Sequence, residues 1–289
     1  MAACEDDPTT MSGATAARRV VITGRGALLP WEGGAAALAR LAAPAPAAPP
    51  APVAFDARAY IGNPKVLRAM HRGFQLTAAA AVLALREAGV AAGGLAAAGI
   101  DPARAGTAVA AGEINPATPD LLATLAGRRL GTAEEWGEFG QAALHGLHPF
   151  RRLALLTNMA AGHVSILFDL QGPSLTLTSG AEAAAQILRE SYWLIAEGRA
   201  DLMVCEAADT PEQAFAPEPA GEAAAAIVLE ALETARARRA PIALEVDAAA
   251  LEAITAGLGA GWESCFPACA PLLAALASVE AAATREVAR

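Results

Sequence analysis

The sequence of 289 residues has few aromatic side chains, a single lysine and no basic stripe. Phe, Trp and Tyr supply 4% of the residues although 55% are hydrophobic, so we expect a core built largely from Ala, Val and Leu. The formal net charge is −9, whereas a nucleic-acid-binding surface needs clustered cations to neutralise phosphates. The composition therefore excludes nucleic acid as an expected partner.

Long apolar runs and a cysteine framework are also absent. No uninterrupted apolar run approaches the roughly 20 residues of a membrane-spanning helix, and the acidic N terminus lacks the basic start of a signal peptide. The four cysteines are too few for a disulfide framework, and neither Cys265 with Cys269 nor His145 with His148 has a further ligand nearby in the sequence. We expect a cytoplasmic protein with no metal, no cofactor and no membrane partner.

Strand and helix patterns alternate along the chain. Short apolar, β-branched runs predict strands, and the longer segments between them predict helices. The longest predicted helix covers 64–89, with a break near Gly73. The predicted strands are 20–23, 107–111, 174–179, 202–205 and 224–229, and the other main helices are 35–41, part of 153–170 and 181–198. Continuous apolar strands separated by helices favour an α/β fold with a covered, largely parallel sheet.

Two glycines after the first predicted strand suggest the start of a dinucleotide-binding loop. Leu29 occupies the place of the third glycine of that motif, and no acidic residue follows at the ribose-binding distance. We therefore interpret Gly24-Arg25-Gly26 as a structural turn.

Residues 158–186 carry the most informative motif. They begin Asn-Met-Ala-Ala-Gly-His at 158–163 and continue Gly-Pro-Ser-Leu-Thr-Leu-Thr-Ser-Gly-Ala at 172–181. The segment resembles the one that carries the nucleophile in β-ketoacyl synthases of the thiolase-like superfamily, where a cysteine takes up the acyl chain. Aligned without a gap, that cysteine falls on Ala181. His163 belongs to the part of the motif that is structural in the family, so we expect no catalytic role for it.

The local pattern explains why the family places its nucleophile there. A strand, a turn at Gly180 and a helix N-terminus would stabilise a thiolate and the oxyanion formed by its attack on a thioester. Alanine has no nucleophilic atom, so no acyl-enzyme can form at Ala181. Ser179 lacks the flanking glycines of a hydrolase serine, and Glu182 is interpreted as a charge at the helix N-terminus.

The resemblance extends over residues 18–246. Matching segments are 18–26, 55–89, 148–150 and 221–230, in the order and spacing of the family. It implies a thiolase-like layered fold with a disordered tail (1–17), a complete N-terminal half (18–246) and a truncated remnant of the second half (247–289). The second half of the family brings two histidines and a lysine, but here no His follows His163 and no Lys follows Lys65.

The family also contains degenerate subunits called chain-length factors, which pair with an active ketosynthase and shape its acyl tunnel. The chain is similar to a short form found in systems that build aryl polyenes. This implies a heterodimer with a full-length ketosynthase, with an acyl carrier protein as a further candidate partner. The strand before the nucleophile pairs across the family's dimer interface, which assigns the interface to Ser174, Leu175, Thr176, Leu177, Thr178 and Ser179.

Two segments line or close the acyl pocket in the family. The resemblance places them at Glu113, Ile114, Asn115 and Thr118, and at Phe150, Arg151, Leu153 and Leu155. The alternative is that these residues only pack the dimer. Arg151 would need a partner in an apolar tunnel, and Glu113 is the candidate by role.

Two other functions stay open. The chain could be an acyl-thioester decarboxylase or hydrolase that uses a different nucleophile on the same scaffold. It could also be a homodimeric acyl-binding or scaffolding protein.

Overall fold

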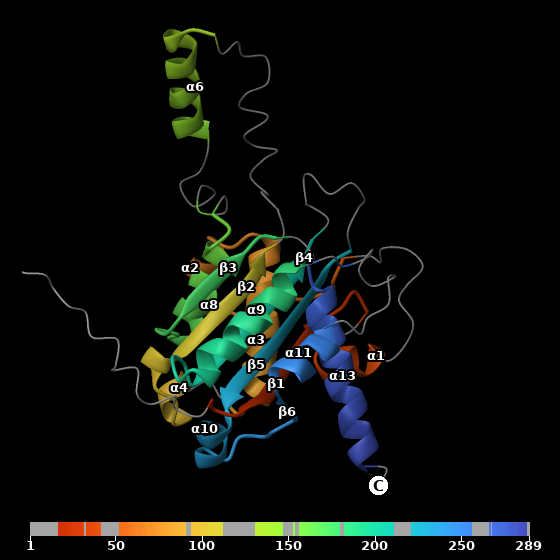
Figure 1. The fold of residues 1–289 in the computed structure, drawn as a ribbon. Coiled ribbons are helices and arrows are strands. Elements are labelled where there is room, and N and C mark those ends of the chain that lie inside the picture. The colour runs from red at the N-terminus through yellow and green to blue at the C-terminus, as the bar shows by residue number, and fades with distance from the viewer. Residues whose placement is uncertain are drawn as a thin grey trace, which may run out of the picture.

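The apolar runs of the sequence form a sheet of six strands, and helices cover both of its faces (Figure 1). The computed structural model describes residues 17–31, 33–41, 52–90, 94–111, 131–146, 153, 156–179, 182–210, 221–255, 266 and 268–287. The strands are β1 (Val20–Leu28), β2 (Ala105–Ala111), β3 (Ser174–Leu177), β4 (Leu202–Asp209), β5 (Ala223–Ala231) and β6 (Leu244–Val246). The helices are α1 (Ala35–Arg40), α2 (Pro64–Leu67), α3 (Arg72–Glu87), α4 (Gly94–Ala97), α6 (Ala133–Gly146), α8 (Met159–Phe168), α9 (Glu182–Ala196), α10 (Leu232–Ala237), α11 (Ala248–Thr255) and α13 (Ala270–Val287).

The strands lie in the order β3-β2-β4-β5-β1-β6. Pairs β3–β2 and β2–β4 are parallel, whereas β4–β5, β5–β1 and β1–β6 are antiparallel. The prediction of an α/β fold is confirmed, but the prediction of a largely parallel sheet is wrong. Helices cover both faces, so the central antiparallel strands are as continuously apolar as parallel ones, and composition alone does not distinguish the two directions.

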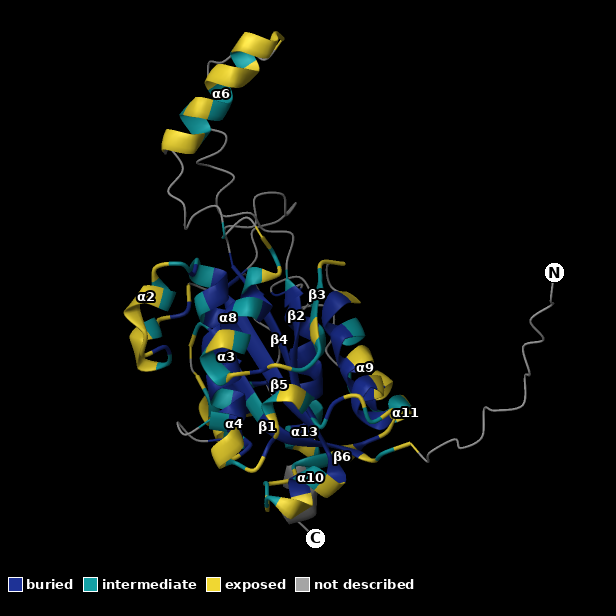
Figure 2. Cartoon of the chain, turned by 90° about the vertical axis from the view of Figure 1, so that its left-hand side faces the viewer, coloured by how far each residue is buried: buried dark blue, intermediate teal, exposed yellow. Residues whose placement is uncertain are grey.

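Two apolar cores lie on opposite faces of the sheet. On one face, α3 and α8 pack over β2, β4 and β5. On the other, α9, α11 and α13 cover the sheet together with α1. Both views show the central strands between these layers, and Figure 2 shows β2, β4 and β5 in the colour of buried residues (Figures 1 and 2).

Gly24 and Gly26 lie inside β1, so the prediction of a turn there is wrong. A Cβ at Gly24 would come within 2.0 Å of the carbonyl oxygen of Ala84, and one at Gly26 within 2.2 Å of that of Ala80. The backbone of α3 therefore lies directly on the strand, which requires glycine at both positions. The register also shifts between Ile22 and Gly24, as in a β-bulge.

The segment 247–289, which the resemblance assigns to a truncated remnant of the second half, contains α11 and α13. Leu272, Leu273 and Leu276 of α13 are fully buried in the same core as α9. The carboxylate of Asp209, at the end of β4, accepts hydrogen bonds from the backbone N–H of Ala268 (3.0 Å) and of Cys269 (2.7 Å). These bonds fix the start of α13 at the carboxyl end of the sheet.

Candidate functional site

The strand assigned to the partner interface is an edge of the sheet. β3 pairs with β2 in the register Thr107↔Ser174 to Ala110↔Leu177 and with no other strand in the described part of the chain. Leu175, Thr176 and Leu177 are half-buried, and Ser174 is exposed. An edge strand of this kind presents unpaired N–H and C=O groups to any strand that can approach it.

The segment before β3 fixes the register of this edge. The backbone N–H of Gly172 donates to the carbonyl of Ala105 (2.8 Å), and that of Thr107 donates to the carbonyl of Pro173 (2.9 Å). A Cβ at Gly106 would lie 2.2 Å from the Pro173 carbonyl oxygen, so the two segments touch through their backbones. In a parallel ladder the pairing alternates, so the N–H groups of Leu175 and Leu177 face β2 and that of Thr176 faces the open edge.

A helix follows the edge strand at the predicted place. β3 ends at Leu177 and α9 begins at Glu182, which confirms the strand and the helix on either side of the expected turn. Gly180 and Ala181 lie outside the described residues. Ser179 donates a hydrogen bond to the amide oxygen of Gln186, 3.0 Å away, which ties the end of the strand to the first turns of α9.

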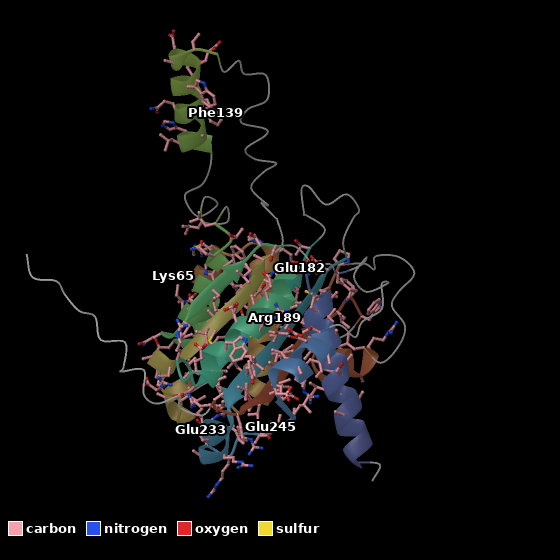
Figure 3. All side chains as sticks on the ribbon, viewed as in Figure 1. Lys65, Phe139, Glu182, Arg189, Glu233 and Glu245 are labelled. Carbon is pink, nitrogen blue, oxygen red and sulfur yellow. The ribbon has the colours of Figure 1, made fainter. Side chains whose placement is uncertain are left out.

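The outward side of α9 is charged. Glu182, Arg189 and Glu190 are exposed, and Glu182 and Arg189 extend from the front of α9 in Figure 3. Arg189 lies 3.5 Å from Glu252 of α11. The inner side of α9 is apolar, with Ile187 and Leu188 fully buried. The helix therefore has one face in the core and one in solvent.

The predicted tunnel residues are mostly outside the described part of the chain. Seven of the eight fall there: Glu113, Ile114, Asn115, Thr118, Phe150, Arg151 and Leu155. The eighth, Leu153, is half-buried. The described neighbours of both segments do lie together, because Ala111 at the end of β2 and Thr157 just before α8 line one pocket.

That pocket lies at the carboxyl ends of β2 and β4, where the N-termini of α3 and α8 meet. Its walls include His71, Phe74, Thr77, Val109, Thr157 and Ala208. The ring of His71 lies against that of Phe74, with 3.6 Å between centroids, and Phe74 lies 5.7 Å from the ring of His163. Sequence reasoning missed this pocket because a lone His in a polar loop carries no signal of its own.

His71 is held in one tautomer. Its Nδ1 accepts a hydrogen bond from the backbone N–H of Gly73 (3.0 Å), which caps α3 and leaves the ring proton on Nε2. A Cβ at residue 73 would meet this ring at 3.0 Å, so glycine leaves room for the cap. Burial and the nearby His163 lower the pKa of His71 to about 4. The ring is therefore neutral at pH 7.

His163 lies within helix α8 and is buried. Its exposed fraction is 4%, and its Nε2 has no hydrogen-bond partner among the described residues. Burial lowers its pKa, so this ring is neutral as well.

A buried acidic residue also lies on the face of the sheet that α3 and α8 cover. Glu206 in β4 is fully buried, and its carboxyl group contacts the hydroxyl of Thr107 at 3.3 Å. Burial raises the pKa of Glu206 well above its ordinary value, which favours the protonated form of its carboxyl group. Its neighbours in the ladder are Val109 and Ala226.

The described thiols are inert. Cys205 and Cys269 are buried, and burial raises the pKa of Cys205 to about 12. Burial and the adjacent Asp209 carboxylate raise the pKa of Cys269 as well. A thiol in such surroundings does not ionise at neutral pH and is a poor nucleophile. Cys265 lies outside the described residues.

The described residues contain no group of three or more His, Cys, Asp or Glu side chains arranged to hold a metal ion. None of their helices combines the length and apolar character needed to cross a bilayer.

Solved structures share this fold. One is a type II PKS acyl-carrier protein in complex with its ketosynthase bound to the hexaketide, with TM-score 0.63 and 20% identity over 80% of this chain and 68% of that one. Another is the ishigamide ketosynthase/chain length factor (TM-score 0.59, 22% identity, 80% and 62% covered). A β-ketoacyl synthase from Burkholderia phymatum STM815 gives TM-score 0.56 at 22% identity, with 79% and 62% covered.

Sequence comparison agrees with the fold. A 3-oxoacyl-[acyl-carrier-protein] synthase 2 from Rhizobium meliloti (strain 1021) is 35% identical over 130 residues, which cover 35% of this chain and 31% of that protein. The chain thus matches about a third of the length of this curated relative. Residues 36–218, more than half of the chain, match the family model described as β-ketoacyl synthase, N-terminal domain. The chain belongs to the β-ketoacyl synthase family and carries its N-terminal domain in a thiolase-like α/β fold.

Proposed function

We propose that the chain is a non-catalytic chain-length factor that pairs with an active ketosynthase and shapes its acyl tunnel. The observation that carries the proposal is Ala181, at the position where the family motif has its cysteine. The flanking β3 and α9 keep the strand and helix of the nucleophile turn, while the reacting atom is missing. The described thiols, with their raised pKa values, offer no replacement.

The edge strand supports a partner of the same fold. β3 is uncharged and alternates Leu with Thr, and nothing in the described chain covers its outer edge. α8, which packs against β2 and β3, has Leu156 just before it and Ile166 on its surface, with exposed fractions of 49% and 68%. A partner strand on β3 would extend the sheet and cover apolar surface beside it.

The outward charges of α9 support the short form, as in aryl polyene systems. A second sheet stacked on this helix would bury Glu182, Glu190 and the ion pair between Arg189 and Glu252, and burying charged groups is unfavourable. In this chain, α11 and α13 pack beside α9 instead. We infer that the ketosynthase partner supplies the catalytic residues and that the pair works in the cytoplasm with an acyl carrier protein.

The segments predicted to line the tunnel stay part of the proposal. Replacing Ile114 or Leu155 with Phe is expected to shorten the product of the complex, and Ala is expected to lengthen or broaden it. Product profiles by mass spectrometry test this, with assembly of each variant complex checked by size exclusion. If all four variants leave the chain length unchanged while the complex assembles, these residues pack the dimer and do not shape the tunnel.

Acyl loading tests the non-catalytic role. The complex with its cognate ketosynthase is incubated with acyl-carrier substrate, and both subunits are weighed intact. The partner is expected to gain an acyl adduct, and this chain is expected to keep its mass. An Ala181→Cys variant is expected to leave condensation by this subunit absent, since no His follows His163 and no Lys follows Lys65 in the sequence.

The same measurement tests the alternative enzyme. Saturable acylation of this chain at Ser179, Cys265 or Cys269 would overturn the non-catalytic role and favour an acyl-thioester decarboxylase or hydrolase. A stable homodimer with no affinity for the ketosynthase would instead favour an acyl-binding scaffold.

A further inference from the structure

The outward face of α9 carries an exposed tryptophan between two charges. Trp193 is 43% exposed, and its ring lies edge-on to that of Tyr192, with 5.2 Å between centroids. Arg189 and Glu197 lie four residues before and after Trp193, so the three side chains form one row along the helix. The backbone N–H of Glu197 donates to the carbonyl of Trp193 (2.9 Å), which continues the helical geometry to the end of this row.

A shallow groove runs beside the row. It has a volume of about 390 Å³ and is lined by Glu190, Trp193, Leu194, Glu197 and Arg199. Sites that hold ligands measure about 300–1,000 Å³, so this groove has room for a large aromatic side chain. Two helices pack by placing a row of side chains from one into a groove of the other. The row and the groove of α9 are therefore the two halves of a helix–helix contact.

The charges of the row have opposite signs on the two sides of Trp193. If a second α9 crosses antiparallel at this residue, Arg189 of each helix lies beside Glu197 of the other. The commonest class of helix crossing lays two rows of this i, i+4 kind along each other. A two-fold contact requires a surface that is complementary to itself, and the sequence of this row meets that condition.

The ion pairs that these charges make within the chain are loose. Arg189 lies 3.5 Å from Glu252, Arg199 lies 3.9 Å from Glu197, and all four side chains are about half exposed or more. Exposed pairs of this kind stabilise a protein little, so exchanging them for pairs with another molecule costs little. A helix crossing at Trp193 would also leave Glu182, about 16 Å away along the helix, in solvent. It therefore avoids the burial of charge that a stacked sheet would cause.

We propose that α9 is the contact surface for a second copy of this chain, with the two α9 helices crossing antiparallel at Trp193. Each Trp193 enters the groove of the other copy, and Arg189 of each copy pairs with Glu197 of the other. This surface lies on a face of the sheet, so it leaves the edge at β3 open and goes beyond the function proposed above. One helix crossing is smaller than the roughly 1,200 Å² interface of a stable complex, so the dimer forms reversibly as the concentration rises.

The test is sedimentation equilibrium of the purified full chain carrying Thr176→Pro, which blocks strand addition at β3. The mass is expected to rise from 29.1 kDa toward twice that value with increasing concentration. Added salt is expected to weaken the dimer, because it screens the ion pairs. A mass that stays at one chain up to about 1 mM would overturn the proposal.

Charge exchange tests the antiparallel pairing. Arg189→Glu and Glu197→Arg each place like charges side by side, and each is expected to weaken the dimer at least tenfold. The double variant restores both pairs with their signs exchanged, so its affinity is expected to return to within about threefold of the parent. The control, Glu252→Gln, removes the present partner of Arg189 and should not weaken the dimer. A double variant that stays as weak as the single ones contradicts the pairing.

The central residue has a matched control. Trp193→Ala is expected to weaken the dimer at least tenfold, whereas Trp31→Ala, at a tryptophan with 42% exposure, should leave it unchanged. Equal affinities for both variants would overturn the contact at α9.

The outcome is separate from that of the proposed function. A chain that dimerises through α9 but never binds a ketosynthase leaves this proposal standing and overturns the proposed function. A chain that binds the ketosynthase but shows no dimer in the sedimentation test does the reverse.

Discussion

The two edges of the sheet are built differently. At one edge, β6 is three residues long, and its Glu245 forms a two-pronged ion pair with Arg19, with both N–O distances 2.5 Å. At the other edge, β3 has no charged residue and alternates Leu with Thr. Short strands and charges discourage strand addition, whereas an uncharged edge invites it. Within the described part of the chain, one edge is therefore protected and the other, β3, is open to strand addition.

The strand β5, between the two edges, is buried and paired entirely within this chain. Every residue of β5 is buried, and its Glu230 makes a two-pronged pair with Arg238 at 2.7 and 2.6 Å. Arg238 also donates to the carbonyl of Ala88 at the end of α3 (2.7 Å). The antiparallel half of the sheet is thus closed within this chain.

The largest expected effect is at the closed half. Arg238→Ala leaves the fully buried carboxylate of Glu230 without its cation, which costs about 3–5 kcal/mol of folding free energy. Urea unfolding followed by circular dichroism measures the loss. The control is Arg236→Ala, at an exposed position of α10 two residues before Arg238, and its unfolding midpoint should match that of the wild type. Equal midpoints for all three proteins would show that the buried pair does not hold this half together.

The next effect is on assembly. Thr176→Pro removes an N–H that faces the open edge and keeps the N–H groups of Leu175 and Leu177 that face β2. We expect affinity for the ketosynthase to fall at least 100-fold, or about 2.7 kcal/mol, while the unfolding midpoint of the isolated chain changes little. Size exclusion with light scattering measures the complex.

The control for that variant lies at the protected edge. Glu245→Thr in β6 is expected to leave the complex intact. If Thr176→Pro binds the ketosynthase as tightly as the wild type, or if Glu245→Thr disrupts binding equally, the partner does not add a strand to β3.

A third prediction concerns β4, which joins the parallel and antiparallel halves. The pKa of Glu206 is raised by burial, so between the unfolded value near 4.3 and the raised folded value the native state holds one proton more than the unfolded state. Stability is therefore full below that unfolded value and falls as the pH rises, by about 1.4 kcal/mol per pH unit. The Glu206→Gln variant has no carboxyl group to titrate at this position, so its stability lacks this dependence on pH.

Urea unfolding at pH 5, 6 and 7 measures this difference. The free energy of unfolding of Glu206→Gln, relative to that of the wild type, is expected to rise by about 1.4 kcal/mol for each pH unit until the folded pKa of Glu206 is passed. Parallel pH profiles for the two proteins would mean that Glu206 is not protonated in the folded chain.

The smallest effect is on the surface beside β3. Ile166→Ser removes an exposed isoleucine of α8 and is expected to weaken the complex by about 1–2 kcal/mol if the partner covers it. Ile242→Ser, at a residue that is also exposed and precedes β6, is the matched control and should not change binding. Calorimetric titration of each variant with the ketosynthase gives the two values, and equal losses would argue against an interface at α8.

The sequence predicted the elements around β3 well. The Ser-Leu-Thr-Leu pattern and the apolar period of α9 are local signals, and the family motif fixed their order. Strand direction was predicted wrongly, because β5 is buried on both faces and its sequence looks like that of a parallel strand. Gly24 and Gly26 were misread because their role is a contact with α3, which lies some 60 residues further along the chain. The pocket was missed for a similar reason, since His71 and Ala208 come together only in the fold.

The late position in the sequence of α13, whose start is bound by Asp209, has a consequence for biosynthesis. Helix α13 is the last described element, and its Leu272, Leu273 and Leu276 cover one face of the sheet. As the chain leaves the ribosome, α9 precedes β4 and can cover part of this face, but the part of β5 that packs against α13 stays uncovered until about 40 further residues beyond β5 have been made. At synthesis rates of about 5–20 residues per second this lasts a few seconds. During that interval the nascent chain presents an apolar surface, so it is a natural client for a chaperone.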